Sequence, residues 1–335
     1  MRVGVLDIGS QSAQLKIADL EPGLPPRPVT TVKQPVRIGE GTDRRGTINA
    51  AAIHRLVGAV THAVAAAQAH QVDSLYPFAT SAVRDAANSE DVLRAVRTAC
   101  GVQLATMTGE EEARLTFLAA RSWYGWSAGP MLLADLGGGT LEIAYGLGRE
   151  PSYAVSLPLG AARLTRDHLT SRQDKPCTKK DLRELQEHIR AGLAAPAAAV
   201  AGHPAPALRV ATSRTFTQLA CLTGAPSAKA GPYAVRTLDR GALARWIPRL
   251  ARMAPAQRAT LPGISRGRAP QMLAGALVAD AVMDLLGVDR FTVCPWALRE
   301  GIFLDRLTSF TRTPAARNRA VPTTVVRRPR RAVRS

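Results

Sequence analysis

Met131–Leu147, MLLADLGGGTLEIAYGL, decides the fold once it is set beside Val3–Asp19, VGVLDIGSQSAQLKIAD. Each stretch has an apolar run leading to an aspartate, Asp7 or Asp135. A turn of glycine and small polar residues follows, and then a second run of strand length. Strand-length runs on both sides of such a turn are typical of a β-hairpin. The sequence therefore predicts the same hairpin twice, once in each half of the chain.

Both turns have the composition of phosphate-binding turns. Glycine lets the backbone approach an anion closely, and successive N–H groups, helped by Ser or Thr hydroxyls, form a cradle for phosphate. A carboxylate beside a polyanion needs a cation between them, so Asp7 and Asp135 predict Mg²⁺ or Mn²⁺. Either turn alone would be read as an ordinary tight turn. The occurrence of two such turns, each between strand-length runs, favours a phosphate-binding site. The candidate phosphate-binding residues are Ser10, Gln11, Ser12, Gly137, Gly138, Gly139 and Thr140.

The net charge of +18 is concentrated at one end. Residues 311–335 contain eight arginines and no acidic residue, so about +10 remains on the rest of the chain. We expect residues 311–335 to form a disordered basic tail, which favours a solvated end over a role in gathering polyanions. The remaining charge favours an anionic ligand, with nucleic acid the less favoured partner.

Features of secreted or membrane proteins are missing from the sequence. The first residues run directly into a strand without a signal-peptide layout, and the longest apolar stretches are too short to cross a bilayer. Cys100, Cys177, Cys221 and Cys294 are scattered without metal-ligand spacing, which predicts buried thiols in a reducing compartment. We therefore expect a cytoplasmic protein that has no membrane partner; whether it forms a homodimer is left open.

Strands and helices alternate along the chain, which is typical of an α/β protein with mixed sheets. The 335 residues suggest about two domains. The pattern predicts strands at 74–79, 102–107, 154–159 and 207–212, and helices over 49–70, from Thr108, from about Arg163, from Lys179 and from Ser213. Glu110–Glu112 open the helix at Thr108, where acidic residues also stabilise the helix dipole, so composition alone assigns them no function.

Five motifs resemble the exopolyphosphatase/guanosine pentaphosphatase (Ppx/GppA) phosphatase family. They are DIGSQS at 7–12, ATSAVR at 79–84, GEEEAR at 109–114, DLGGGTLE at 135–142 and ALREG at 297–301. The stretches at 78–86, 124–129 and 294–301 resemble its short two-domain actinobacterial exopolyphosphatases especially closely. The resemblance implies two ribonuclease-H-like domains of the actin/Hsp70/sugar-kinase superfamily, with the active site in an interdomain cleft. We expect these domains at 1–124 and 125–297, with a helix at 298–310 returning to the first.

The resemblance also implies roles for single residues. Glu112 matches the family's catalytic glutamate, which activates the attacking water, and Asp135 and Glu142 match carboxylates that hold the divalent cation, with Asp7 as a further ligand. Arg84 matches an arginine that contacts the terminal phosphate, a task suited to a forked guanidinium. Gln11 stands where the family usually has Asn, and Thr140 where Ser is common; both keep hydrogen-bonding groups.

The function expected from these residues is hydrolysis of terminal phosphoanhydride bonds in inorganic polyphosphate, with release of orthophosphate. A chain without further C-terminal domains offers less surface to a long polymer, which favours short chains. Guanosine pentaphosphate is the alternative substrate within the same family. A sugar or acetate kinase is a second class, although the acidic run at 110–112 has no obvious task there. A non-enzymatic polyphosphate or RNA binder, supported mainly by the arginine tail, is a third.

Overall fold

The computed structural model describes residues 1–43, 45–169 and 177–311. Contacts within the chain divide it into two units. The first contains Met1–Met107 and the residues from Ile302 onward, and the second contains Thr108–Gly301. The expected disordered tail lies outside the described residues, apart from Thr311.

The first unit is built on a five-stranded sheet with the strand order β3-β2-β1-β4-β5. Strands β1 and β2 are antiparallel and form the first predicted hairpin, while β1 and β4 are parallel. The elements are β1 (Arg2–Ile8), β2 (Ser12–Asp19), β3 (Arg27–Pro35), the 3-10 turn η1 (Ile38–Gly41), α1 (Ala50–Ala69), β4 (Ser74–Ala79), α2 (Ser81–Arg84), α3 (Ser89–Cys100) and β5 (Ala105–Thr106).

Helix α1 confirms the helix predicted over 49–70. Asn49 caps its first turn by accepting a hydrogen bond from the backbone N–H of Ala52, as Asn commonly does at this position. Leu56 and Val60 pack into a core that also contains Leu15 of β2 and Val96 of α3. Among the described helices, α1 alone is long and apolar enough to cross a membrane, although its buried face belongs to this core.

The second unit is built on a six-stranded sheet with the order β10-β11-β9-β6-β7-β8. Its elements are α4 (Gly109–Tyr124), η2 (Trp126–Ala128), β6 (Met131–Leu136), β7 (Leu141–Gly146), β8 (Tyr153–Leu157), α5 (Ala161–Leu164), a π-helical turn η3 (Thr165–Leu169), α6 (Lys179–Ala201), β9 (Leu208–Thr212), α7 (Ser213–Leu222), η5 (Ala228–Ala230), β10 (Thr237–Asp239), α8 (Arg240–Arg252), α9 (Pro255–Arg258), η6 (Ala269–Gln271), α10 (Met272–Leu285) and β11 (Arg290–Val293). Helix α11 (Leu298–Thr311) begins in this unit and continues into the first.

The two sheets share one topology. In each, a hairpin is extended by a third antiparallel strand on one side and a parallel strand on the other: β3-β2-β1-β4 in the first unit and β8-β7-β6-β9 in the second. The predicted duplication and the mixed sheets are therefore confirmed. The duplication places Asp7 and Asp135 at equivalent positions, one residue before the end of the first strand of each hairpin.

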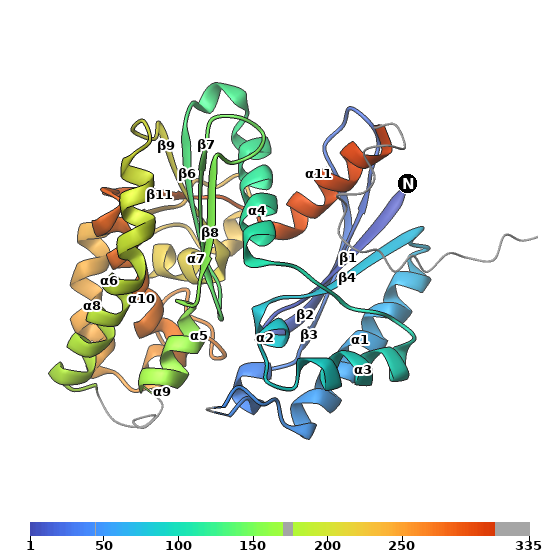
Figure 1. Ribbon diagram of the computed structural model, residues 1–335, viewed down its shortest axis with the longest axis horizontal. Helices are drawn as coiled ribbons and strands as arrows, with labels where there is room; N and C mark the ends of the chain where they lie inside the picture. Colours follow the sequence, from blue (N-terminus) through green and yellow to red (C-terminus); the bar gives the residue numbers. More distant parts are fainter. Residues whose placement is uncertain (44, 170–176, 312–335) are drawn as a thin grey trace, which may run out of the picture. The chain divides into compact units, whose positions relative to one another are not determined.

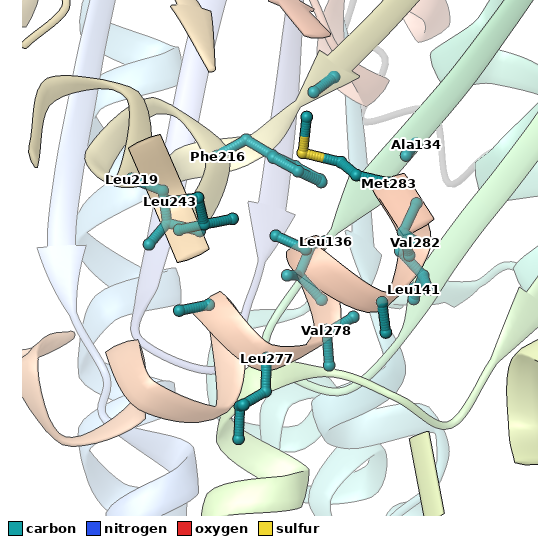
Figure 2. Close-up of a cluster of buried hydrophobic side chains, with 14 of the residues drawn as sticks. Ala134, Leu136, Leu141, Phe216, Leu219, Leu243, Leu277, Val278, Val282 and Met283 are labelled. Carbon is teal, nitrogen blue, oxygen red and sulfur yellow. The ribbon is translucent and has the colours of Figure 1, made fainter. Parts of the chain in front are cut away.

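Helices cover both faces of the second sheet. Figure 1 shows α4 on one side of β6–β8 and α6, α8 and α10 on the other. Around α10, Phe216, Leu243 and Val282 pack against Ala134 and Leu136 of β6 (Figure 2). On the opposite face, Phe117 of α4 packs against Met131, Leu133 and Ala144. Alternate residues of β6 thus face different cores, and Asp135, in step with Met131 and Leu133, lies on the α4 face.

Two features of the structure differ from the sequence-based expectations. Helix α4 belongs to the second unit, whereas the expected first domain ran to residue 124; its contacts are with β7 and β8, on which Phe117 packs. No element was predicted where β10, α8 and α9 lie. Helix α8 contains four arginines and an interior proline, Pro248, and the proline obscured its helical pattern.

The cysteines are all free, as expected. Only Cys294 is buried, however; Cys100, Cys177 and Cys221 are half-buried. The expectation that all four thiols would be buried is wrong, because three of them lie at helix ends or in connecting segments rather than in the sheet cores.

Candidate active site

The glycine turn between β6 and β7 is fixed from one side by the segment that leads into α5. The N–H of Ala161 donates to the Gly137 carbonyl at 3.0 Å, and the N–H groups of Ala162 and Arg163 both donate to the Gly138 carbonyl at 2.9 Å. The Gly160 N–H donates to the Gly139 carbonyl at 3.3 Å. Three consecutive carbonyl groups of the turn are therefore held toward α5.

This arrangement fixes the direction of the N–H groups of the turn. In a trans peptide the C=O and N–H of one plane point in opposite directions. Because the carbonyls of Gly137, Gly138 and Gly139 point toward α5, the N–H groups of Gly138, Gly139 and Thr140 point away from it. Three successive N–H groups with a common direction form an anion-binding nest. The sequence suggested such a cradle, and the structure adds the contacts that orient it.

The turn between β1 and β2 has a comparable arrangement in the first unit. The N–H of Gly39 donates to the Ser10 carbonyl at 3.4 Å, and the N–H groups of Val36 and Arg37 donate to the Gln11 carbonyl at 3.1 and 3.2 Å. By the same geometry, the N–H groups of Gln11 and Ser12 point away from η1. Both predicted cradles are thus built on carbonyls engaged by a neighbouring loop.

Arg84 lies at the end of the short helix α2 and is held within the first unit. Its Nε donates to the Asp85 carboxylate at 2.8 Å and its Nη1 donates to the Met107 carbonyl at 2.9 Å. The side chain is 20% exposed. The family resemblance gives this arginine a role in phosphate contact, and that role stays a prediction.

Three side chains form a row across the second sheet. In the antiparallel register, Asp135 of β6 lies directly opposite Glu142 of β7, which lies directly opposite Ser156 of β8. Directly opposite residues point to the same face of the sheet, here the face that α4 covers. Glu142 is only 4% exposed, and its Oε1 accepts a hydrogen bond from the Ser156 Oγ at 2.7 Å.

The first turn of α4 lies over this row. Thr108 caps the helix by accepting a hydrogen bond from the Glu111 N–H at 3.2 Å. Gly109 lies so close to Ser156 that a Cβ at Gly109 would overlap the Ser156 side chain. Glu112 follows three residues later on the same helix surface and is 6% exposed. The structure thus brings Glu112, Asp135 and Glu142 into one unit.

The acidic run at 110–112 serves more than one purpose. Arg114 donates from Nε and Nη2 to the two carboxylate oxygens of Glu111, at 2.8 Å each, and from Nη1 to Glu150 at 3.1 Å. Glu111 therefore takes part in a surface ion pair, and Glu110 is exposed. Glu112 is the buried carboxylate of the three. An acidic residue can stabilise the helix dipole without being buried, so the dipole does not explain the burial of Glu112.

Sequence reasoning missed Arg268, which interacts electrostatically with Asp135. Burial lowers the pKa of Arg268 to about 10, the charge of Arg214 acts in the same direction, and Asp135 opposes both. Arg268 also donates to the Thr215 hydroxyl at 3.4 Å. Arg268 lies far from Asp135 in the sequence and in no recognisable motif, so only folding brings the two charges near each other.

The end of β9 is also beside this site. Thr212 lies opposite Asp135 in the parallel register of β6 and β9, and it is completely buried. The next residue, Ser213, has φ 99°, a backbone conformation that residues other than glycine rarely adopt. Backbone strain of this kind tends to gather at functional sites.

The donor set suits a divalent cation. Asp135 and Glu142 are like charges directly opposite each other, an arrangement that destabilises a sheet unless a cation or hydrogen-bond donor compensates it. Mg²⁺ typically takes one or two carboxylates from a protein and completes its shell with water and substrate phosphate. Within the described residues, no three His, Cys, Asp or Glu side chains gather closely enough to hold an ion by themselves. The third predicted ligand, Asp7, lies in the first unit.

Comparison with known proteins shows the family of the chain. Residues 16–310 match the Ppx/GppA phosphatase family. The chain belongs to this family. Exopolyphosphatase 1 of Mycobacterium tuberculosis is 46% identical to this chain over 309 residues, which cover 92% of this chain and 89% of that protein. Exopolyphosphatase 1 of Mycobacterium leprae is 45% identical, with coverage of 92% and 90%.

Solved structures of Ppx/GppA proteins share the fold. An exopolyphosphatase from Cytophaga hutchinsonii superimposes with a TM-score of 0.82 at 21% identity, covering 92% of this chain and 98% of that one. The Aquifex aeolicus family member gives 0.74 at 23% identity, with coverage of 93% and 99%. The two mixed sheets described above are consistent with a two-domain actin-like fold, as the sequence predicted.

Proposed function

We propose that this Ppx/GppA family member is an exopolyphosphatase that removes terminal orthophosphate from inorganic polyphosphate. The observation that carries the proposal is the nest of N–H groups at Gly138, Gly139 and Thr140, in the same unit as the buried carboxylates Glu112 and Glu142. A nest binds an oxyanion, and a buried carboxylate can orient a water molecule toward it. The name of the relatives that are 45–46% identical, Exopolyphosphatase 1, supports the same substrate.

Each residue has a distinct role in this proposal. The N–H groups of Gly138, Gly139 and Thr140 bind phosphate oxygens, and Glu112 accepts a hydrogen bond from the attacking water and takes its proton. Burial of Glu112 strengthens this interaction, because little bulk water competes for the carboxylate. Asp135 and Glu142 hold Mg²⁺ or Mn²⁺. When bound, the cation neutralises negative charge on the transferring phosphoryl group.

Residues of the first unit complete the proposal. Ser10, Gln11 and Ser12 bind further phosphates of the substrate, Arg84 contacts the terminal phosphate, and Asp7 adds a carboxylate toward the cation. Short chains are the proposed substrates and the cytoplasm is the proposed location. These statements rest on the family resemblance and on the composition of the chain.

The test compares Glu112→Gln with Glu110→Gln. Both substitutions remove one negative charge from the first turn of α4, but Glu110 is exposed whereas Glu112 is buried. Phosphate release is measured from short polyphosphate, long polyphosphate and guanosine pentaphosphate, with Mg²⁺, with Mn²⁺ and with EDTA. A lost general base reduces turnover by about 10²–10⁴-fold.

We expect cation-dependent release from short polyphosphate that Glu112→Gln abolishes and Glu110→Gln retains. Faster release from guanosine pentaphosphate than from polyphosphate would replace the proposed substrate with the other substrate of the family. Polyphosphate binding without release from any substrate would contradict the hydrolase proposal and indicate a binding protein. Equal losses in the two variants would mean that Glu112 acts only through the charge of the helix.

A further inference from the structure

The hydroxyl of Ser156 makes a short side-chain hydrogen bond within the carboxylate row. Its Oγ donates to the Oε1 of Glu142 at 2.7 Å, and the two residues are directly opposite each other in the β7–β8 register. No family motif identified in the sequence includes Ser156. We propose that Ser156 is a positioning residue for the cation site, an inference that rests on the proposed role of Asp135 and Glu142 as cation ligands.

The hydrogen bond holds one carboxylate oxygen of Glu142 against β8. A glutamate has three rotatable side-chain bonds, and its terminal torsion is broad. The bond from Ser156 fixes which oxygen of Glu142 faces β8, so the other oxygen keeps a defined direction. Partners of this kind orient metal ligands, and their removal typically weakens metal binding by about 10–100-fold.

The same hydrogen bond places a donor beside two carboxylates. Glu142 is 4% exposed and lies directly opposite Asp135 across the β6–β7 pair. Like charges directly opposite each other destabilise a sheet. A hydrogen bond from a hydroxyl to a carboxylate, such as the one from Ser156 to Glu142 at 2.7 Å, is among the stronger hydrogen bonds in proteins.

A second contact connects Ser156 with the helix that carries Glu112. Gly109 lies against the Ser156 side chain, with no room there for a Cβ on Gly109. The first turn of α4 therefore packs on the residue that orients Glu142. Ser156 therefore contacts both Glu142, the proposed cation ligand, and the first turn of α4, the helix that carries Glu112. Its proposed effect is to position these two groups.

Ser156→Ala removes the donor and leaves the Cβ that packs on Gly109. Ser152→Ala is the matched control: Ser152 lies beside the same hairpin, and its Oγ donates to the Tyr145 carbonyl at 3.2 Å. Both variants lose one hydroxyl and one hydrogen bond, but only Ser156 touches the carboxylate row. Ser156→Thr restores the hydroxyl.

The readout is the Kd for Mn²⁺ without substrate, measured by electron paramagnetic resonance of free Mn²⁺, together with the Tm of the metal-free protein. We expect Ser156→Ala to bind Mn²⁺ about 10–100-fold more weakly than wild type. We expect its metal-free Tm to match that of Ser152→Ala, which binds Mn²⁺ like wild type. Ser156→Thr should recover most of the affinity, and the Mn²⁺ concentration for half-maximal phosphate release should follow the Kd in each variant.

Wild-type affinity in Ser156→Ala would overturn the inference while leaving the proposed function intact. Weak binding that Ser156→Thr does not restore would also overturn it, because packing on Gly109 and not the hydroxyl would then set the affinity. Absence of Mn²⁺ binding in the wild-type protein would overturn the proposed cation role itself, and the wild-type measurement alone identifies that case.

Discussion

Gly160→Ala tests whether the glycine turn acts as a phosphate cradle. The backbone of Gly160 has φ −67° and ψ 145°, which alanine adopts without strain, so the substitution changes only the space that the residue fills. A Cβ at this position would lie 2.5 Å from the carbonyl carbon of Gly138 and closer still to the backbone of Gly139 and Thr140. All of these neighbours are backbone atoms, which cannot turn aside as a side chain can.

The expected effect follows from this overlap. To restore an ordinary contact of about 3.4 Å, the turn and Gly160 must separate by roughly 1 Å. Such a shift stretches the hydrogen bonds that orient the N–H groups of Gly138, Gly139 and Thr140. A misplacement of about 1 Å at a catalytic site can cost about 100-fold in rate, or about 2.7 kcal/mol of transition-state stabilisation. Overpacking costs about 1–3 kcal/mol of stability, which leaves a typical protein folded.

The assay is kcat/KM for phosphate release from short polyphosphate, together with the Tm. The control is Gly58→Ala in α1, where a Cβ would meet no atom within 4 Å. That control should keep wild-type kcat/KM and gain about 0.5–1 kcal/mol of stability from the better helix propensity of alanine. Wild-type kcat/KM in a folded Gly160→Ala protein would refute the cradle reasoning.

Two further predictions concern the cation and the pH dependence of stability. Saturating Mn²⁺ at about 100 times its Kd should raise the Tm of the wild type by about 4 °C, but not that of Asp135→Asn, and equal shifts in both would place the cation elsewhere. The hydrogen bond from Arg190 to Asp284, helped by Arg240, holds the pKa of Asp284 below its ordinary 3.8. The ionised Asp284 carboxylate therefore contributes fully to stability above about pH 4, and this contribution is lost as the pH falls through the lowered pKa. Asp284→Asn should therefore reduce the free energy of unfolding at pH 7 by about 0.5–1 kcal/mol in urea titrations, and a difference that persists undiminished at pH 3 would contradict this.

The elements around the site could be predicted from the sequence because each depends on a pattern within one short segment. A hairpin needs only two neighbouring strands and a turn, so the runs around Asp7 and Asp135 predicted both hairpins correctly. Helix α1 was readable because its cap and its apolar spacing lie within one segment. Helix α8 was missed because a proline inside a segment, here Pro248, counts against a helix, although Leu243 and Leu250 pack in the core.

The sequence by itself determined the repeated hairpins, the small residues of the two turns and the carboxylates at the ends of the strands. Only the tertiary structure decided that α4 belongs with the second sheet, that the Gly160 segment holds the carbonyls of the glycine turn, and that Ser156 and Arg268 interact with the carboxylates. The physical reason is the range of the interactions. Turn and strand preferences are set by adjacent residues, whereas the orientation of a carbonyl or a carboxylate depends on groups that only the packed core brings into contact.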